Sequence, residues 1–220
     1  MSAKIQDQRC TYRSVLPNKL SGILKLEAAQ KLENQQLGCT DRHQHQRDHF
    51  ELQIPEHVLK RKGSTTTSGV PKEVRALLDL GAIETVNLAE WLVVDQESLA
   101  RNLFQKENWN FLLQPLAESF GLLKIKTAPK KMEVLGMVLA QGFPTKGQFE
   151  NALRRLKEHR SDIVRSWACF MIGKRSELSL QESLKRIQPL AADKNMSVRE
   201  AAWLAIRPRI ITQLGESLRL

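Results

Sequence analysis

Four side chains of types that commonly bind zinc fall within eleven residues in the N-terminal part of the chain: Cys39, His43, His45 and His49. A closed zinc site takes four cysteine or histidine ligands at characteristic spacings. The spacing of this set matches no closed zinc motif, and a solvated polar helix or a disordered segment explains the composition better. We therefore predict neither a metal site nor a cofactor.

A second pair of interest is Trp91 and Asp95 in the segment WLVVD. Residues at i and i+4 share one face of an α-helix. Asn87, followed three residues later by Glu90, has the spacing of a capping box and predicts a helix that starts there and runs through EWLVVDQESLARNLFQ. The alternative is that Trp91 packs in the core among leucines and that Asp95 is a solvated or salt-bridged helix residue.

The elements that must position these residues are indicated by a pattern that occurs twice. The segments 161–173 (SDIVRSWACFMIG) and 195–208 (NMSVREAAWLAIRP) match at an offset of 34 residues, which we call the repeat interval. Apolar residues at i, i+4 and i+8 form one stripe of a helix, and the arginine after the first valine points toward a neighbouring turn. The matched positions are Val164 and Val198, Arg165 and Arg199, Ala168 and Ala202, Ile172 and Ile206, Leu153 and Ile187, and Leu156 and Leu190.

Composition favours an all-α protein. Aromatic residues make up 5% of the 220 residues, and alternating valine, isoleucine and threonine runs typical of strands are absent. No apolar run approaches about 18 residues, and the N-terminus lacks the apolar core of a signal peptide, so we expect a cytoplasmic protein without a membrane segment. Cys10, Cys39 and Cys169 are too few and too scattered for a disulfide framework.

Capping signals and apolar spacing predict eight helices from residue 70 onward, and such helix pairs stack to bury their apolar faces. This predicts a helical-repeat superhelix (α-solenoid) with a concave inner wall in residues 70–220. Residues 1–69 are polar and contain a linker-like KRKGSTTTSG run, so we expect a poorly structured extension. The expected helices span 71–81, 87–105, 109–120, 129–141, 146–160, 161–172, 179–192 and 197–212.

The positive charge is concentrated in the C-terminal part. The chain has 34 Lys and Arg against 24 Asp and Glu, a net charge of +10. Residues 70–143 hold 8 basic and 9 acidic residues, a net charge of −1, whereas residues 144–220 hold 15 and 8, a net charge of +7. A basic concave face would attract a polyanion such as nucleic acid, although a basic surface can also be simply solvated.

The type of repeat is indicated by VREAAWLAIRPRI (198–210) and VRSWACFMIG (164–173). The tetratricopeptide signature is absent, and a Val-Arg pair near the start of a second helix resembles HEAT repeats. Over the last third of the chain, these segments resemble the last repeats of bacterial DNA alkylation repair proteins, the HEAT-like alkylpurine DNA glycosylases of the AlkC and AlkD type.

The resemblance implies that the chain holds duplex DNA in a basic groove and cleaves the glycosidic bond of cationic N3- or N7-alkylated purines. It implies catalytic roles for Asp95, Trp91 and Trp203, and a grip on the DNA backbone by Arg165. Arg207 and Arg209 flank Pro208 at the basic end of the chain, which favours phosphate contacts. The basic residues assigned to DNA are Arg165, Arg199, Arg207, Arg209, Lys174 and Arg175.

Three hypotheses stay open: a glycosylase acting as a monomer on alkylated double-stranded DNA, a catalytically inactive DNA-binding paralogue, and a HEAT-repeat scaffold that binds protein. Arg165 follows Asp95 at about twice the spacing found in the family, which argues against catalysis. Structural roles compete at Trp203 as a core residue and at Arg165 and Arg199 as ligands of adjacent loops. The chain contains no P-loop, GxGxxG, HExxH or GxSxG motif.

Overall fold

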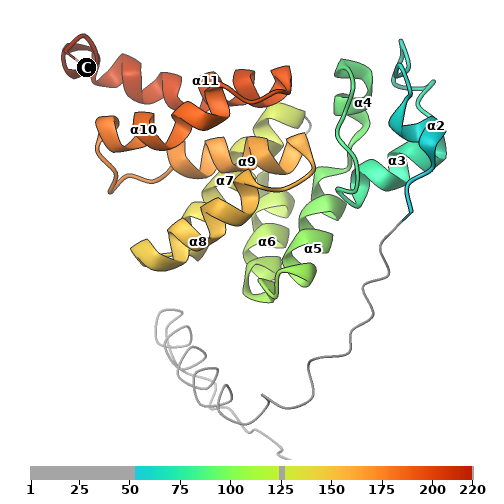
Figure 1. The fold of residues 1–220 in the computed structure, drawn as a ribbon. Helices are drawn as coiled ribbons and strands as arrows, with labels where there is room; N and C mark the ends of the chain where they lie inside the picture. Colours follow the sequence, from blue (N-terminus) through green and yellow to red (C-terminus); the bar gives the residue numbers. More distant parts are fainter. Residues whose placement is uncertain (1–52, 124–126, 220) are drawn as a thin grey trace, which may run out of the picture. The chain divides into compact units, whose positions relative to one another are not determined.

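The computed structural model describes residues 53–123 and 127–219, and within them every regular element is helical (Figure 1). The all-α prediction is thereby confirmed for the described part of the chain. The elements are α2 (Glu56–Leu59), α3 (Lys72–Asp79), α4 (Leu88–Val93), α5 (Gln96–Lys106), a 3-10 helix (Asn110–Leu112), α6 (Leu113–Leu123), α7 (Ala128–Gly142), α8 (Lys146–Lys157), α9 (Asp162–Gly173), α10 (Leu180–Ala191), α11 (Met196–Thr212) and α12 (Leu214–Ser217).

The compact unit begins at Leu52, earlier than the boundary at residue 69 expected from the sequence. Val58 on α2 is almost completely buried, and Arg61 forms an ion pair of 2.8 Å with the buried Glu90. The linker-like run therefore belongs to the packed unit. The cysteine and histidine set at residues 39–49 lies outside the described residues.

The centre of the fold is a row of three helices, α7, α9 and α11, in which α9 contacts both neighbours (Figure 1). Helix α8 packs against α9, and α10 packs against both α9 and α11. Every side chain of α9 from Asp162 to Ile172 is buried, which reflects its position between these neighbours. The indole of Trp167 is fully buried, and its Nε1 donates to Oε1 of Gln96 on α5 at 3.4 Å.

Helix starts in this part of the chain recur at the repeat interval seen in the sequence. Helices α7, α9 and α11 begin at Ala128, Asp162 and Met196, and α8 and α10 begin at Lys146 and Leu180. Their caps recur as well. The N-cap residues Thr145 and Ser179 both form complete capping boxes, with Gln148 and Glu182 respectively. Equivalent side chains thus start equivalent helices.

One long helix expected from the sequence is two helices. Asn87 does cap the first of them, because its side chain accepts from the Glu90 N–H at 3.1 Å. Helix α4 ends at Val93, and Val94 is extended with φ −61° and ψ 123°. Adjacent β-branched valines weaken helix continuation, and an aspartate is a strong N-cap. Asp95 accordingly starts α5.

Candidate functional site

The segment that carries α4 is fastened to the N-terminal ends of α9 and α11. The buried Asp162 carboxylate accepts hydrogen bonds from Thr85 N at 2.9 Å, from Thr85 Oγ1 at 2.7 Å and from Ser197 Oγ at 2.8 Å. Asn195 Nδ2 donates to the Thr85 carbonyl at 3.2 Å. These bonds satisfy polar groups that burial would otherwise penalise, and they position the α4 residues over the central helices.

Arg165 stabilises the same junction and is only 5% exposed. Its guanidinium pairs with Asp193 (Nε to Oδ2, 2.8 Å) and with Glu84 (Nη2 to Oε1, 2.7 Å). Its Nη1 also donates to the carbonyls of His159 and Arg160. The assignment of Arg165 to a DNA contact therefore gives way to a structural role, because its donors are occupied inside the protein.

Arg199 occupies the equivalent position one repeat later and behaves differently. Its Nη1 donates to the carbonyls of Asp193 and Lys194, which lie one repeat interval after those that Arg165 contacts. Arg199 is exposed and has no carboxylate partner in the described part of the chain. It therefore combines a turn-stabilising role with an accessible positive charge.

The remaining basic residues assigned to DNA fall into two groups. Arg175 is 8% exposed and donates to the carbonyls of Ala140, Phe143 and Pro144, so it too has a structural role. Arg209 donates to Leu178 O and Ser183 Oγ. By contrast, Lys174 and Arg207 are exposed, with Lys174 paired to Glu133.

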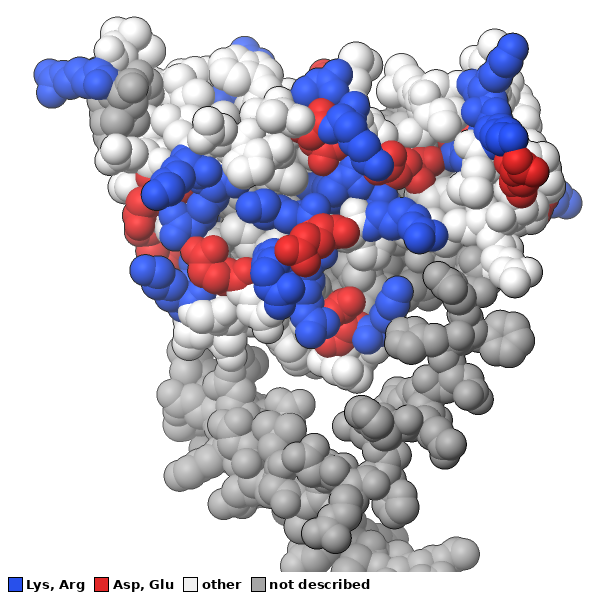
Figure 2. Space-filling model, viewed as in Figure 1, with Lys and Arg blue, Asp and Glu red and all other residues white. Residues whose placement is uncertain are grey.

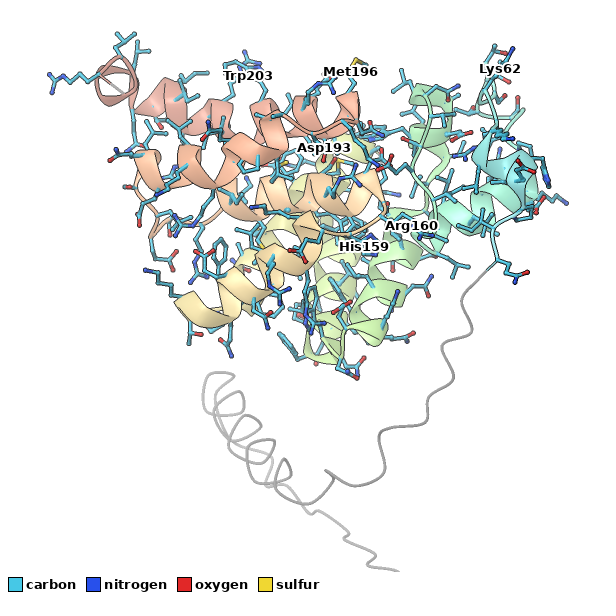
Figure 3. All side chains as sticks on the ribbon, in the orientation of Figure 1. Lys62, His159, Arg160, Asp193, Met196 and Trp203 are labelled. Atoms are coloured by element: carbon cyan, nitrogen blue, oxygen red, sulfur yellow. The ribbon has the colours of Figure 1, made fainter. Side chains whose placement is uncertain are left out.

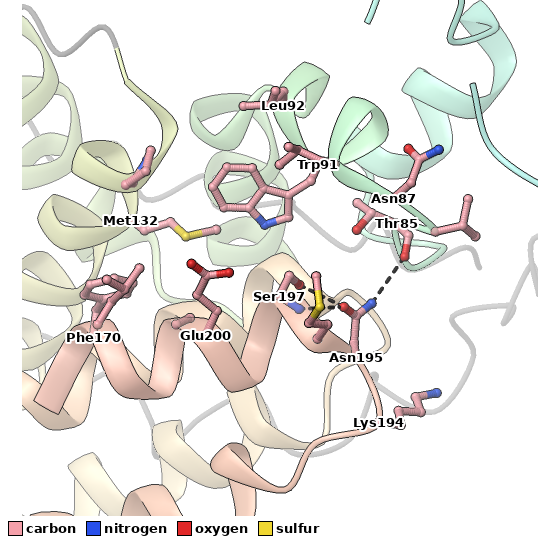
Figure 4. Close-up of a pocket in the computed structure, with 16 residues that line it drawn as sticks. Thr85, Asn87, Trp91, Leu92, Met132, Phe170, Lys194, Asn195, Ser197 and Glu200 are labelled. Carbon is pink, nitrogen blue, oxygen red and sulfur yellow. Dashed lines mark hydrogen bonds between the residues drawn. The ribbon is translucent and has the colours of Figure 1, made fainter. Parts of the chain in front are cut away.

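A groove of about 570 Å³ lies between α4, α7 and α11, with Phe170 of α9 also in its lining (Figure 4). We call it the apolar groove, because most of its lining is hydrophobic and, among the described residues, Lys194 is its one basic lining residue. The basic surplus thus does not lie in this groove. The lining residues are Thr85, Val86, Asn87, Leu88, Trp91, Leu92, Pro129, Met132, Phe170, Lys194, Asn195, Met196, Ser197, Glu200, Ala201 and Leu204.

Trp91 and Glu200 approach the apolar groove from opposite sides. Figure 4 shows the indole of Trp91 on α4 above the Glu200 carboxylate, which points toward it from α11. The Trp91 Nε1 atom is buried and has no hydrogen-bond acceptor among the described residues. Glu200 is exposed and forms neither a hydrogen bond nor an ion pair in that same part of the chain. Sequence reasoning missed Glu200.

Asp95 does not share a face with Trp91, because the helix ends between them. Its carboxylate caps α5, accepting from Glu97 N at 3.1 Å and from Ser98 Oγ at 2.7 Å. Partial burial would raise the pKa of this carboxyl, but the bonds from Ser98 and Glu97 outweigh burial and lower it below its usual value. The expected Trp91–Asp95 face is therefore wrong, and Asp95 acts as a cap.

Trp203 on α11 (Figure 3) is not among the residues that line the apolar groove. It is 53% exposed and lines a second groove between α10 and α11, together with Lys185 and Arg199. The core role considered for Trp203 is wrong, since more than half of the side chain is accessible. The three residues assigned to catalysis thus occupy three separate places.

The surface charge of the C-terminal helices is mixed but unbalanced (Figure 2). Four of its carboxylates form ion pairs: Glu150 with Arg186, Glu158 with Arg154, Glu177 with Arg175 and Asp193 with Arg165. Several basic side chains have no carboxylate partner among the described residues: Lys157, Arg160, Lys185, Arg199 and Arg207.

His159 is a half-buried base next to the Arg165 junction, and its Nδ1 accepts from Ser161 N at 3.0 Å. Burial, reinforced by the charge of Lys106, lowers the pKa of His159 to about 4 from an ordinary 6.5. Between pH 6.5 and about 4, His159 is therefore protonated in the unfolded chain but not in the folded chain.

We expect the free energy of unfolding to fall as pH drops from 6.5 toward 4, with His159 contributing at most about 1.4 kcal/mol per pH unit. Urea denaturation of the wild type at several pH values in this window measures the slope. His159→Asn keeps an acceptor but does not titrate, so its slope should be smaller. Equal slopes in the two proteins would contradict the assignment.

The fold class is thus all-helical, built in its C-terminal part from helix pairs that recur at the repeat interval. The chain matches no family model, and neither a curated protein nor a solved structure is significantly similar to it. None of the helices in the described residues combines the length and hydropathy of a membrane span.

Proposed function

We propose that the chain is a HEAT-like helical-repeat protein that binds double-stranded DNA without excising a base. Recurrence at the repeat interval supports the repeat arrangement: the helix starts, the capping boxes and the contacts of Arg165 and Arg199 with the preceding turn all recur in this way. Stacked pairs of this kind form an extended superhelix with a binding surface along it.

The basic side chains without carboxylate partners carry the DNA-binding proposal. Arg160, Lys185 and Arg199 are exposed and belong to a region with a net charge of +7. Because basic residues outnumber acidic ones in this region by 15 to 8, positive charge is left for phosphates even after every internal ion pair is counted. Trp203, exposed beside Lys185 and Arg199, adds an aromatic face next to two cations.

Separation of the residues assigned to catalysis favours the non-catalytic alternative. Asp95 uses its carboxylate to cap α5, Trp91 lies in the apolar groove, and Trp203 lies in the second groove. The resemblance to alkylpurine DNA glycosylases implies that a carboxylate and aromatic faces act together around one sugar. Methylated DNA incubated with the protein should therefore release no 3-methyladenine or 7-methylguanine; release that is lost in Asp95→Asn would contradict this.

Salt dependence of binding to a fluorescent DNA duplex tests the main proposal. Affinity should fall steeply with salt, with a log-log slope of about −0.9 for each phosphate contacted. Lys185→Ala and Arg199→Ala should each weaken binding and make the slope shallower by up to about 0.9. Lys72 is an exposed lysine on α3, so Lys72→Ala is the matched control and should change neither the DNA affinity nor the salt slope. Absent or salt-independent binding would contradict the proposal and favour a protein scaffold.

A further inference from the structure

The apolar groove has a hydrophobic rim that is accessible to solvent. Leu88 is 68% exposed and Leu92 49% on α4, and Met196 is 69% exposed and Leu204 39% on α11. All four side chains line the groove, so they form one apolar surface on its two sides. Contiguous apolar surfaces of this kind mark sites of interaction, because their burial by a partner is favourable.

Two polar groups of the groove are unused, and they differ in chemistry. The Trp91 N–H is a donor without an acceptor, and the Glu200 carboxylate lacks a donor, within the residues that the structure describes. The other polar side chains of the lining have partners. The Asp162 carboxylate accepts hydrogen bonds from Thr85 and Ser197, and Lys194 pairs with Glu84. Asn87 donates to the Ser64 carbonyl and Asn195 to the Thr85 carbonyl. Because the Trp91 N–H is closed to solvent, the Glu200 carboxylate is the group that an occupant can reach, and it calls for a cationic group.

We propose that the apolar groove binds an amphipathic basic helix of a partner protein. Apolar side chains of that helix enter between α4 and α11, and a lysine or arginine pairs with Glu200. Helices recognised in this way place apolar anchors at i, i+3, i+4 and i+7. A nucleic acid fits less well, because an apolar wall with an unpaired carboxylate repels phosphate.

The occupant is a polypeptide rather than a small ligand because the exposed rim extends the apolar surface beyond the floor of the groove, which is formed by the buried Met132 and Phe170. Leu88 and Met196 are each more than two-thirds exposed, so a molecule confined to the floor would leave much of their surface in water. A helix lying along the groove covers the floor and both rims. Attachment of the α4 segment to Asp162 keeps the two walls in place before the partner binds.

Fluorescent helical peptides of about five turns test the proposal with the full chain. One series carries leucines at i, i+3, i+4 and i+7 flanked by lysines, and the matched series replaces those lysines by glutamates. We expect the lysine series to bind at least about tenfold more tightly, and the Trp91 indole N–H resonance to shift on binding. Equal binding of the two series, or no binding of either, would overturn the proposal.

Variants of the groove separate its walls from its charge. Leu92→Ser and Leu204→Ser should each weaken binding of the lysine peptide about tenfold, whereas Leu59→Ser on α2, similarly exposed but outside the groove, should not. Glu200→Gln should reduce the preference for lysine over glutamate peptides. Binding that is unchanged in these groove variants would also refute the site. DNA binding should be unaffected by them, which keeps this result separate from the proposed function.

Discussion

Replacing Arg165 by alanine should lower the free energy of unfolding by about 3 kcal/mol, because it removes the guanidinium that two carboxylates and two carbonyls share at a buried junction. Asp193 and Glu84 would lose the guanidinium that offsets their partial burial. Arg165→Lys should recover less than half of the loss, since an ammonium cannot form the forked contacts of a guanidinium. Urea denaturation followed by circular dichroism measures both effects.

Arg199 provides the matched control because it is the same residue type, one repeat later, with the same contacts to the preceding turn. It is exposed and has no carboxylate partner in the described residues, so Arg199→Ala should cost less than about 1 kcal/mol. In DNA binding the order should be reversed, with Arg199 the more important of the two. Similar losses of stability in both variants would show that the ion pairs of Arg165 contribute little.

The difference between these two arginines marks the limit of what the sequence could predict. Local patterns were informative: the repeat interval coincides with the spacing of the helix starts, and Asn87 caps a helix as expected. Whether a repeated arginine is buried depends on Glu84, which precedes α4 and lies several helices before Arg165 in the chain. No local spacing encodes that encounter.

The candidate site was only partly predictable for the same physical reason. Trp91 was identified, but the carboxylate expected beside it starts the next helix, because Asp95 is a better cap than a helix-interior residue. Glu200 faces Trp91 from α11, a helix far along the chain from α4. A signal existed in the sequence: Met196, Glu200 and Leu204 share one helical face, and two large apolar residues around a single charge suggest a surface for a partner.

At Gly136, α7 packs so close to α9 that an added side chain would clash. A Cβ at this position would lie 2.3 Å from Phe170 Cβ and 2.7 Å from the Phe170 carbonyl carbon. The second atom belongs to the backbone of α9, which cannot move aside as the end of a flexible side chain can. Gly136→Ala should therefore force the two helices apart.

We expect Gly136→Ala to lower the free energy of unfolding by about 2 kcal/mol, because overpacking outweighs the gain of about 1 kcal/mol in helix propensity. Gly121→Ala on α6, with no atom within 4 Å of the new Cβ, should instead raise it by about 0.5–1 kcal/mol. Urea denaturation should show that the same glycine-to-alanine substitution changes the free energy of unfolding in opposite directions at the two positions. An unchanged or increased stability of Gly136→Ala would contradict the close packing.

The same substitution connects the helix packing to the apolar groove. Phe170, the residue that Gly136 contacts, lines the groove together with Met132, which is on the same helix as Gly136. Separation of α7 from α9 should displace Phe170 and weaken the binding of the lysine peptide, although residue 136 itself is outside the lining. Gly121→Ala should leave peptide binding unchanged. A variant that loses stability but keeps full peptide affinity would show that the helical partner contacts the exposed rims of α4 and α11 and not the floor.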